Sequence, residues 1–107
     1  MQLDTMYIIK SGDLRYTKGG GSDAGRAGFS AKISLKTAHK MGKLATAEKF
    51  LAEQRSMCER SVDAYINAKP HGDWYTAERI AAELAEAQQK LALWQAARIA
   101  EVKLVEA

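Results

Sequence analysis

The sequence predicts an α+β fold, in which a small antiparallel sheet of about three strands precedes a long antiparallel two-helix hairpin. Seven of the eight glycines precede Leu44, whereas most of the alanines follow it. Glycine marks turns and alanine favours helices. Hydrophobic residues make up 47% of the 107 residues, which is typical of a packed globular protein. We therefore expect a single domain over residues 1–107, with strands and loops up to residue 44 and helices from residue 45.

The strands are expected near the N-terminus. Residues 6–10 are rich in β-branched and aromatic side chains, Ser-Gly-Asp follows as a turn signal, and residues 14–17 suit a return strand. This pattern predicts a β-hairpin. Residues 18–28 contain five glycines and predict a flexible loop. Residues 29–35 alternate in the manner of a third strand.

A short helical turn is expected after the third strand. Leu35, Ala38 and Met41 recur every three residues, as in one turn of an α- or 3₁₀-helix. Gly42 then interrupts the pattern. Thr46 is the expected N-cap of the first long helix, which should run to about Asn67.

Pro70 and Gly72 predict a tight connection to the second helix, whose expected N-cap is Thr76 or Asp73. With no helix breaker before Val105, the second helix is expected over residues 77–104. The short connection favours an antiparallel hairpin.

The C-terminal part of this second helix is apolar on several faces from Leu91 onward. A helix that is apolar all round has to be buried all round. Either the sheet covers it within one chain, or a second copy of the chain does. The residues expected at such a self-association surface are Leu93, Trp94, Ala97, Leu104 and Val105.

Composition and charge bear on the functional class. The net charge of +3 excludes an acidic mimic of DNA. The single cysteine, Cys58, cannot form an internal disulfide, which favours a reducing cytoplasm. The first residues include Asp4 and do not resemble a secretory signal, and no apolar run approaches the roughly 20 residues that span a bilayer. We expect a cytoplasmic protein that does not contact a membrane.

We find no motif for catalysis, a metal or a cofactor. The glycine-rich string has Arg26 where a P-loop needs lysine and Ala27 where it needs a hydroxyl. Cys58 lies in the apolar stripe of the first helix, where a free cysteine usually acts as a small buried hydrophobe. His71 and Asp73 offer two metal ligands without a second cluster to complete a site. The expectation is a protein that is not an enzyme and that uses no cofactor.

The most informative charge feature is a basic run between residues 26 and 43. It contains no acidic residue, and residues 1–44 hold eight basic against three acidic residues, a net +5. Such a run can follow nucleic-acid phosphates, contact an acidic protein, or be an ordinary solvated face. The residues expected to make the charged contact with a partner are Arg26, Lys32, Lys36, Lys40 and Lys43.

Three strings in the N-terminal half carry a resemblance. Residues 7–16 read Tyr-Ile-Ile-Lys-Ser-Gly-Asp-Leu-Arg-Tyr, the Leu-x-x-Ala-x-x-Met spacing follows, and residues 45–51 read Ala-Thr-Ala-Glu-Lys-Phe-Leu. Together they resemble small bacteriophage or prophage proteins whose N-terminal module is a short antiparallel sheet. The resemblance covers roughly residues 6–52 and departs from the pattern in the long glycine loop and at Met41, where phenylalanine is common. The shared residues are a packing signature, so no functional residue carries over.

This resemblance implies a phage-encoded accessory protein, and such proteins often bind and redirect a host protein. We therefore expect a non-enzymatic protein-binding protein, acting as a homodimer in the host bacterial cytoplasm. Its expected role is to inhibit a host or antiviral-defence protein, for example one of CRISPR type. The alternative is a small nucleic-acid-binding or regulatory protein that uses the basic N-terminal run.

Overall fold

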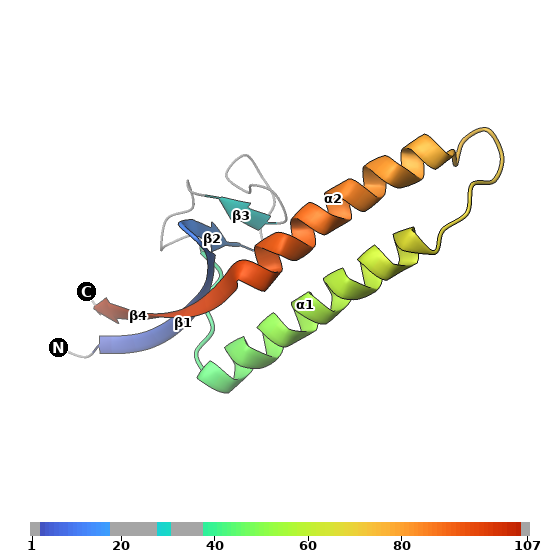
Figure 1. The fold of residues 1–107 in the computed structure, drawn as a ribbon. Coiled ribbons are helices and arrows are strands. Elements are labelled where there is room, and N and C mark those ends of the chain that lie inside the picture. Colours follow the sequence, from blue (N-terminus) through green and yellow to red (C-terminus); the bar gives the residue numbers. More distant parts are fainter. Residues whose placement is uncertain (1–2, 18–27, 31–37, 106–107) are drawn as a thin grey trace.

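The computed structural model of the chain describes residues 3–17, 28–30 and 38–105. Its four strands form one antiparallel sheet in the order β3-β2-β1-β4. Figure 1 shows the two helices side by side, projecting from the sheet with their connecting loop at the far end. The α+β class is confirmed. In chain order the elements are β1 (Leu3–Ser11), β2 (Leu14–Tyr16), β3 (Phe29–Ser30), α1 (Leu44–Ile66), α2 (Ala77–Ala96) and β4 (Ala97–Val105).

The expected N-terminal β-hairpin is present. Lys10 pairs with Arg15 and Ser11 with Leu14. Gly12 has φ of 60° in the turn between them, a conformation that glycine adopts without steric cost. The third strand, β3, pairs with β2. The remainder of that expected strand, and the glycine-rich residues 18–27, lie outside the described residues.

The helical turn expected around Met41 is wrong for the residues that the structure describes. The Tyr7 amide donates to the Met41 carbonyl oxygen at 2.8 Å, and the Met41 amide donates to the Tyr7 carbonyl oxygen at 2.9 Å. Met41 is therefore an isolated bridge on the edge of β1. Ala38 and Met41 are both buried, but in different apolar clusters, so their spacing of three reflects burial without a helical turn.

The first helix begins two residues before the expected N-cap. Lys43 occupies the N-cap position without a side-chain hydrogen bond, and Thr46 lies inside α1. The Asn67 side-chain amide donates to the Asp63 carbonyl oxygen at 2.9 Å and helps to end the helix. The residues that α1 buries are Ala47, Leu51 and Cys58.

The start of α2 was predicted correctly, and its end was not. The Thr76 hydroxyl accepts a hydrogen bond from the Arg79 amide at 3.1 Å, which is the N-cap arrangement. The helix ends at Ala96, eight residues before the expected Leu104, and β4 follows directly. Nine consecutive pairs join β4 to β1, from Ser11 opposite Ala97 to Leu3 opposite Val105. The sheet therefore has a fourth strand in addition to the three that were expected.

The strand explains why residues after Leu91 are apolar on several faces. Ile99 packs on one face of the sheet against the main core cluster, which contains Ile9. Ala100 and Val102 pack on the other face against Ile8 and a second small cluster. Each face of β4 thus packs apolar side chains within the chain, whereas its charged residues Arg98, Glu101 and Lys103 stay exposed.

A guanidinium group marks the junction between α2 and β4. The Arg55 Nε donates to the Trp94 carbonyl oxygen at 2.9 Å, and its Nη2 donates to the Ala97 carbonyl oxygen at 2.6 Å. The last carbonyls of a helix have no partner within the helix. Arg55 therefore satisfies, from α1, the groups that a continued helix would have used.

The core lies where the sheet meets the helices. Trp94 is 1% exposed, and its ring centroid lies 4.9 Å from that of Phe29, 5.1 Å from Tyr16 and 6.0 Å from Phe50. Burial in this cluster raises the pKa of Tyr16. The helical hairpin extends far beyond the core, so the molecule measures 63 × 28 × 19 Å.

Candidate functional site

The expected charged patch is mostly outside the described residues. Arg26, Lys32 and Lys36 fall in the segments that the structure does not describe. Lys43 is exposed at the start of α1. Lys40 is half-buried, and its ammonium group lies 3.4 Å from the Ala38 carbonyl oxygen. Only these last two residues can be placed, so the patch stays a prediction.

The expected self-association residues do not form one surface. Trp94 and Ala97 are 1% and 4% exposed and belong to the chain's own core. That part of the expectation is wrong, because neither side chain can reach a second folded copy. Leu93 is half-buried and lines a groove of about 580 Å³ beside Ser11 and Leu14. Leu104 and Val105 belong to β4, opposite Asp4 and Leu3.

Cys58 lies on the face of α1 that packs into the core. Burial raises the pKa of its thiol, a nearby positive charge on Lys90 partly offsets this, and Glu59 adds to the rise. The thiol is therefore protonated at neutral pH, and a thiol is a weaker nucleophile than a thiolate. Among the described residues, no group of three or more His, Cys, Asp and Glu side chains is placed to hold a metal ion.

The most distinctive surface is the tip of the helical hairpin, the loop of residues 67–76. The His71 amide donates to the Tyr75 carbonyl oxygen at 3.0 Å, which closes the loop into a small antiparallel bridge. Gly72 has φ of 66° inside it. A Cβ at that position would lie 3.2 Å from two atoms of the Trp74 ring. The turn therefore needs glycine both for its backbone and for the close approach of the indole.

Three rings gather on this loop. The ring centroids of His71 and Trp74 lie 5.0 Å apart and meet edge to face, and those of Trp74 and Tyr75 lie 5.6 Å apart. Such arrangements are favourable for aromatic pairs. Trp74 nevertheless remains 64% exposed. The loop thus holds a large apolar side chain in place without covering it.

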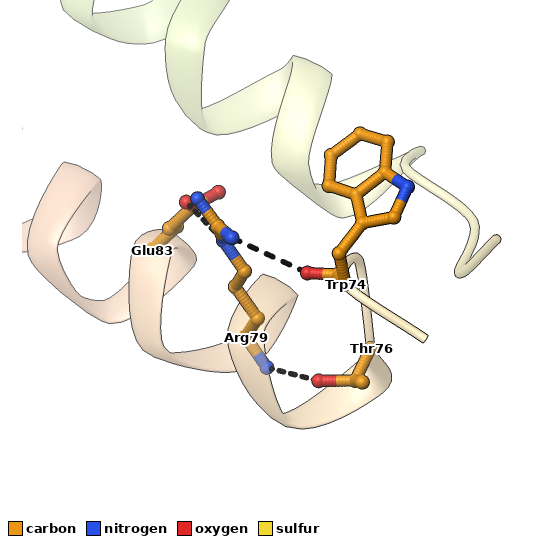
Figure 2. A network of polar contacts seen from close by, with 4 residues as sticks. All are labelled: Trp74, Thr76, Arg79 and Glu83. Atoms are coloured by element: carbon orange, nitrogen blue, oxygen red, sulfur yellow. Dashed lines mark hydrogen bonds and ion pairs between the residues drawn. The ribbon is translucent and has the colours of Figure 1, made fainter. Parts of the chain in front are cut away.

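Arg79 fixes the backbone that carries Trp74. Figure 2 shows its guanidinium between the Glu83 carboxylate and the Trp74 carbonyl, each at 3.2 Å. The indole in the same view extends away from this network. The network binds the main chain of Trp74 and leaves its side chain for other contacts.

The two helices add apolar surface behind the tip. Ile66, at the end of α1, is 59% exposed. A groove of about 320 Å³ runs between the helices here. Its lining residues are Tyr65, Ile66, Ala68, Pro70, Ala77, Ile80, Ala81 and Leu84.

The tip combines features that favour protein recognition. Tryptophan is enriched among the residues that dominate interface energies, and a held side chain loses less conformational entropy on binding. The sequence of residues 69–73 predicts only a connection between two helices, so this site was not expected. The available signal was a tryptophan two residues after a Pro-x-Gly turn, where an apolar side chain has little chance of reaching a core.

Comparisons with protein-family models, curated proteins and solved structures found no match to the chain. Within the described part of the chain, neither helix has the length and hydrophobicity needed to cross a membrane.

Proposed function

We propose that this chain is a non-enzymatic protein-binding protein that docks onto a partner protein with the tip of its helical hairpin. The observation that carries the proposal is the exposed side chain of Trp74. The loop that carries it is held by the hydrogen bond between His71 and Tyr75 and by the hydrogen bond from Arg79 to the Trp74 carbonyl oxygen. Trp74 is 64% exposed, and an exposed apolar side chain that belongs to a larger apolar surface marks an interaction site. At the same end of the hairpin, Ile66 is also exposed, and the groove between the helices is lined in part by Ala68 and Pro70 of the tip loop.

The charges around the tip define the partner further. Residues 63–83 contain four acidic and two basic residues, a net charge of −2. A net negative charge at this end of the hairpin favours a partner whose contact surface is apolar at its centre and basic at its edge. The same charges disfavour nucleic acid at the tip, because phosphates would be repelled.

The N-terminal resemblance supports a more specific role. It suggests a phage-encoded protein that inhibits a host or antiviral-defence protein, for example one of CRISPR type, inside the bacterial cytoplasm. A hairpin that projects from its sheet suits inhibition, since the tip can enter a recess that a compact domain cannot reach.

Binding is tested with a tip variant and a matched control. The tagged chain is used to capture partners from nuclease-treated bacterial extract, and each captured protein is purified and titrated against the variants. We expect Trp74→Ala to raise the Kd at least tenfold, which corresponds to about 1.4 kcal/mol or more. Met57→Ala removes another exposed apolar side chain, 52% exposed in α1, and should change the Kd by less than twofold. Equal Kd values for both variants would reject the tip as the docking site.

Inhibition of defence is tested separately. A bacterium with a CRISPR-type system is challenged with a targeted phage, with and without the chain. We expect the wild-type chain to raise the efficiency of plating and Trp74→Ala to lose this effect. No rise with the wild-type chain would reject inhibition of that system, while the binding measurements would still decide the role of the tip.

The alternative, nucleic-acid binding, is favoured by the net +5 of residues 1–44. It predicts that nucleic acid co-purifies with the chain and that affinity falls steeply with salt, because phosphate contacts release counterions. A purified protein with an absorbance ratio typical of pure protein and no salt-dependent binding to DNA or RNA would remove it.

A further inference from the structure

The outer edge of β4 is the feature that the proposed function leaves unused. In the order β3-β2-β1-β4, this strand stands at the end of the sheet. It is nine residues long and pairs with β1 along its whole length. No other described residue pairs with its second edge. A long edge strand presents a row of backbone donors and acceptors for another strand.

The hydrogen bonds of Tyr7 show which residues of β4 face outward. Both backbone groups of Tyr7 are used by Met41, on the side of β1 away from β4. Tyr7 stands opposite Glu101, so this pair exchanges no hydrogen bonds. The amide and carbonyl of Glu101 therefore point away from β1. By the alternation of an antiparallel ladder, those of Ile99 and Lys103 do the same.

We propose that β4 pairs antiparallel with β4 of a second copy, which joins two four-stranded sheets across a two-fold axis at Val102. In this register Glu101 of each copy lies opposite Lys103 of the other. Both side chains are exposed. Opposite charges directly across an antiparallel pair stabilise it. The occupant of this edge is thus a second copy of the same chain.

Charge and backbone select this register from its neighbours. A shift by two residues in one direction would set Glu101 opposite Glu101 of the other copy. A shift by two residues in the other direction would set Lys103 opposite Lys103 of the other copy. Like charges directly opposite each other are destabilising. A shift by four residues would set Lys103 opposite Ala97 of the other copy. The Ala97 carbonyl oxygen already accepts a hydrogen bond from Arg55 at 2.6 Å, so it is not free for a second strand. A shift by an odd number of residues would place the core faces of the two copies on opposite sides of the joined sheet.

The dimer has a consequence for the tips. Figure 1 shows β4 leading away from the sheet end of α2, on the side opposite the hairpin loop. Antiparallel pairing of β4 therefore sends the two hairpins in opposite directions. The pairing closes on itself and leaves no free β4 edge, which limits growth to two copies.

Charge reversal tests the register directly. Light scattering on a size-exclusion column should give the wild-type chain a mass near twice 11.7 kDa at micromolar concentration. Glu101→Lys and Lys103→Glu each set like charges opposite each other, so each alone should raise the dimer dissociation constant at least tenfold. The double variant E101K/K103E should restore the dimer. Mixing the two single variants should give a heterodimer, because their charges are then complementary.

Two controls separate loss of the dimer from loss of folding. Circular dichroism establishes that each variant is folded, and restoration by the double variant shows that lost dimers do not reflect lost folding. Trp74→Ala, at the other end of the molecule, should leave the dimer intact. A wild-type monomer at all concentrations would overturn the proposal. Single variants that dimerise like the wild type, or a double variant that stays monomeric, would overturn it equally.

Discussion

The Arg55 guanidinium on α1 donates a 2.6 Å hydrogen bond to the carbonyl oxygen of Ala97, the first residue of β4. Arg55 Nε donates a second hydrogen bond, at 2.9 Å, to the carbonyl oxygen of Trp94 in the last turn of α2. One side chain thus holds the point at which a helix becomes a strand. Its positive charge also complements the negative end of the helix dipole.

Loss of this guanidinium should destabilise the fold. Arg55→Met leaves two partly buried carbonyl oxygens without their charged donor, so we expect the free energy of unfolding to fall by about 1.5–3 kcal/mol. Urea denaturation followed by circular dichroism measures the change. Arg60→Met removes an exposed arginine from the same helix and should cost less than about 0.5 kcal/mol. Similar losses for both variants would contradict the role given to Arg55.

The two tryptophans should respond in opposite ways. Trp94 is buried at the centre of the ring cluster, and Trp94→Ala should lower the free energy of unfolding by about 3–5 kcal/mol through the cavity it leaves. Trp74 is 64% exposed, so Trp74→Ala should cost less than about 1 kcal/mol. Thermal and urea unfolding of the two variants make the comparison. A large loss at Trp74 would mean that it serves folding more than binding.

Gly72 should be needed for the shape of the tip. Gly72→Ala forces a left-handed conformation on a residue with a Cβ, which costs about 1–2 kcal/mol, and brings that Cβ to 3.2 Å from the Trp74 ring. We expect a shift in the Trp74 emission, measured in the Trp94→Phe background. Gly42→Ala is the matched control, because a Cβ there meets no atom within 4 Å. An unchanged emission for Gly72→Ala would contradict the contact.

The two threonines expected to cap helices should differ in the same assay. Thr76→Ala removes the side-chain acceptor of the 3.1 Å hydrogen bond from Arg79 and should cost about 1 kcal/mol. Thr46→Ala changes an exposed residue inside α1, where alanine has the higher helix propensity, and should be neutral or slightly stabilising. A loss at Thr46 equal to that at Thr76 would restore the N-cap expected from the sequence.

The Cys58 thiol should react slowly while the chain is folded. Burial raises its pKa, so at neutral pH the thiolate is rarer than in the unfolded chain. We expect thiol-reactive dye to label the native protein at least tenfold more slowly than protein in urea. Because the folded state favours the neutral thiol, this stabilisation is complete at neutral pH and is lost as the pH rises through the raised pKa. Fast labelling of native protein would contradict the burial of Cys58.

The local features of this fold were readable from the sequence. The Ser-Gly-Asp turn with φ of 60° at Gly12, the N-cap at Thr76, and the end of α1 before Pro70 each depend on residues close together in the chain. Their physical causes, turn geometry and helix capping, are local. The prediction of a hairpin in the sheet and a hairpin of helices therefore held.

The errors share a different cause. Residues 97–105 contain no glycine or proline, and their alanine, leucine and glutamate suit a helix as well as a strand. The alternation of apolar residues at 100, 102 and 104 with charged residues at 101 and 103 was the available signal, and it was weaker than the absence of a helix breaker. The tip was missed for a related reason, since only the fold shows that Trp74 stands 64% exposed on an ordered loop.

By itself, the sequence determined the α+β class, the first β-hairpin, the two helices and the cap that begins α2. The tertiary structure decided that the chain after Ala96 is the fourth strand of the sheet, that Trp94 and Ala97 belong to the core, and that the outer edge of β4 faces away from β1. The reason is the range of the interactions. Capping and turns act over a few residues, whereas β4 exists because β1 and Arg55, far away in the chain, offer its backbone better partners than another turn of helix would.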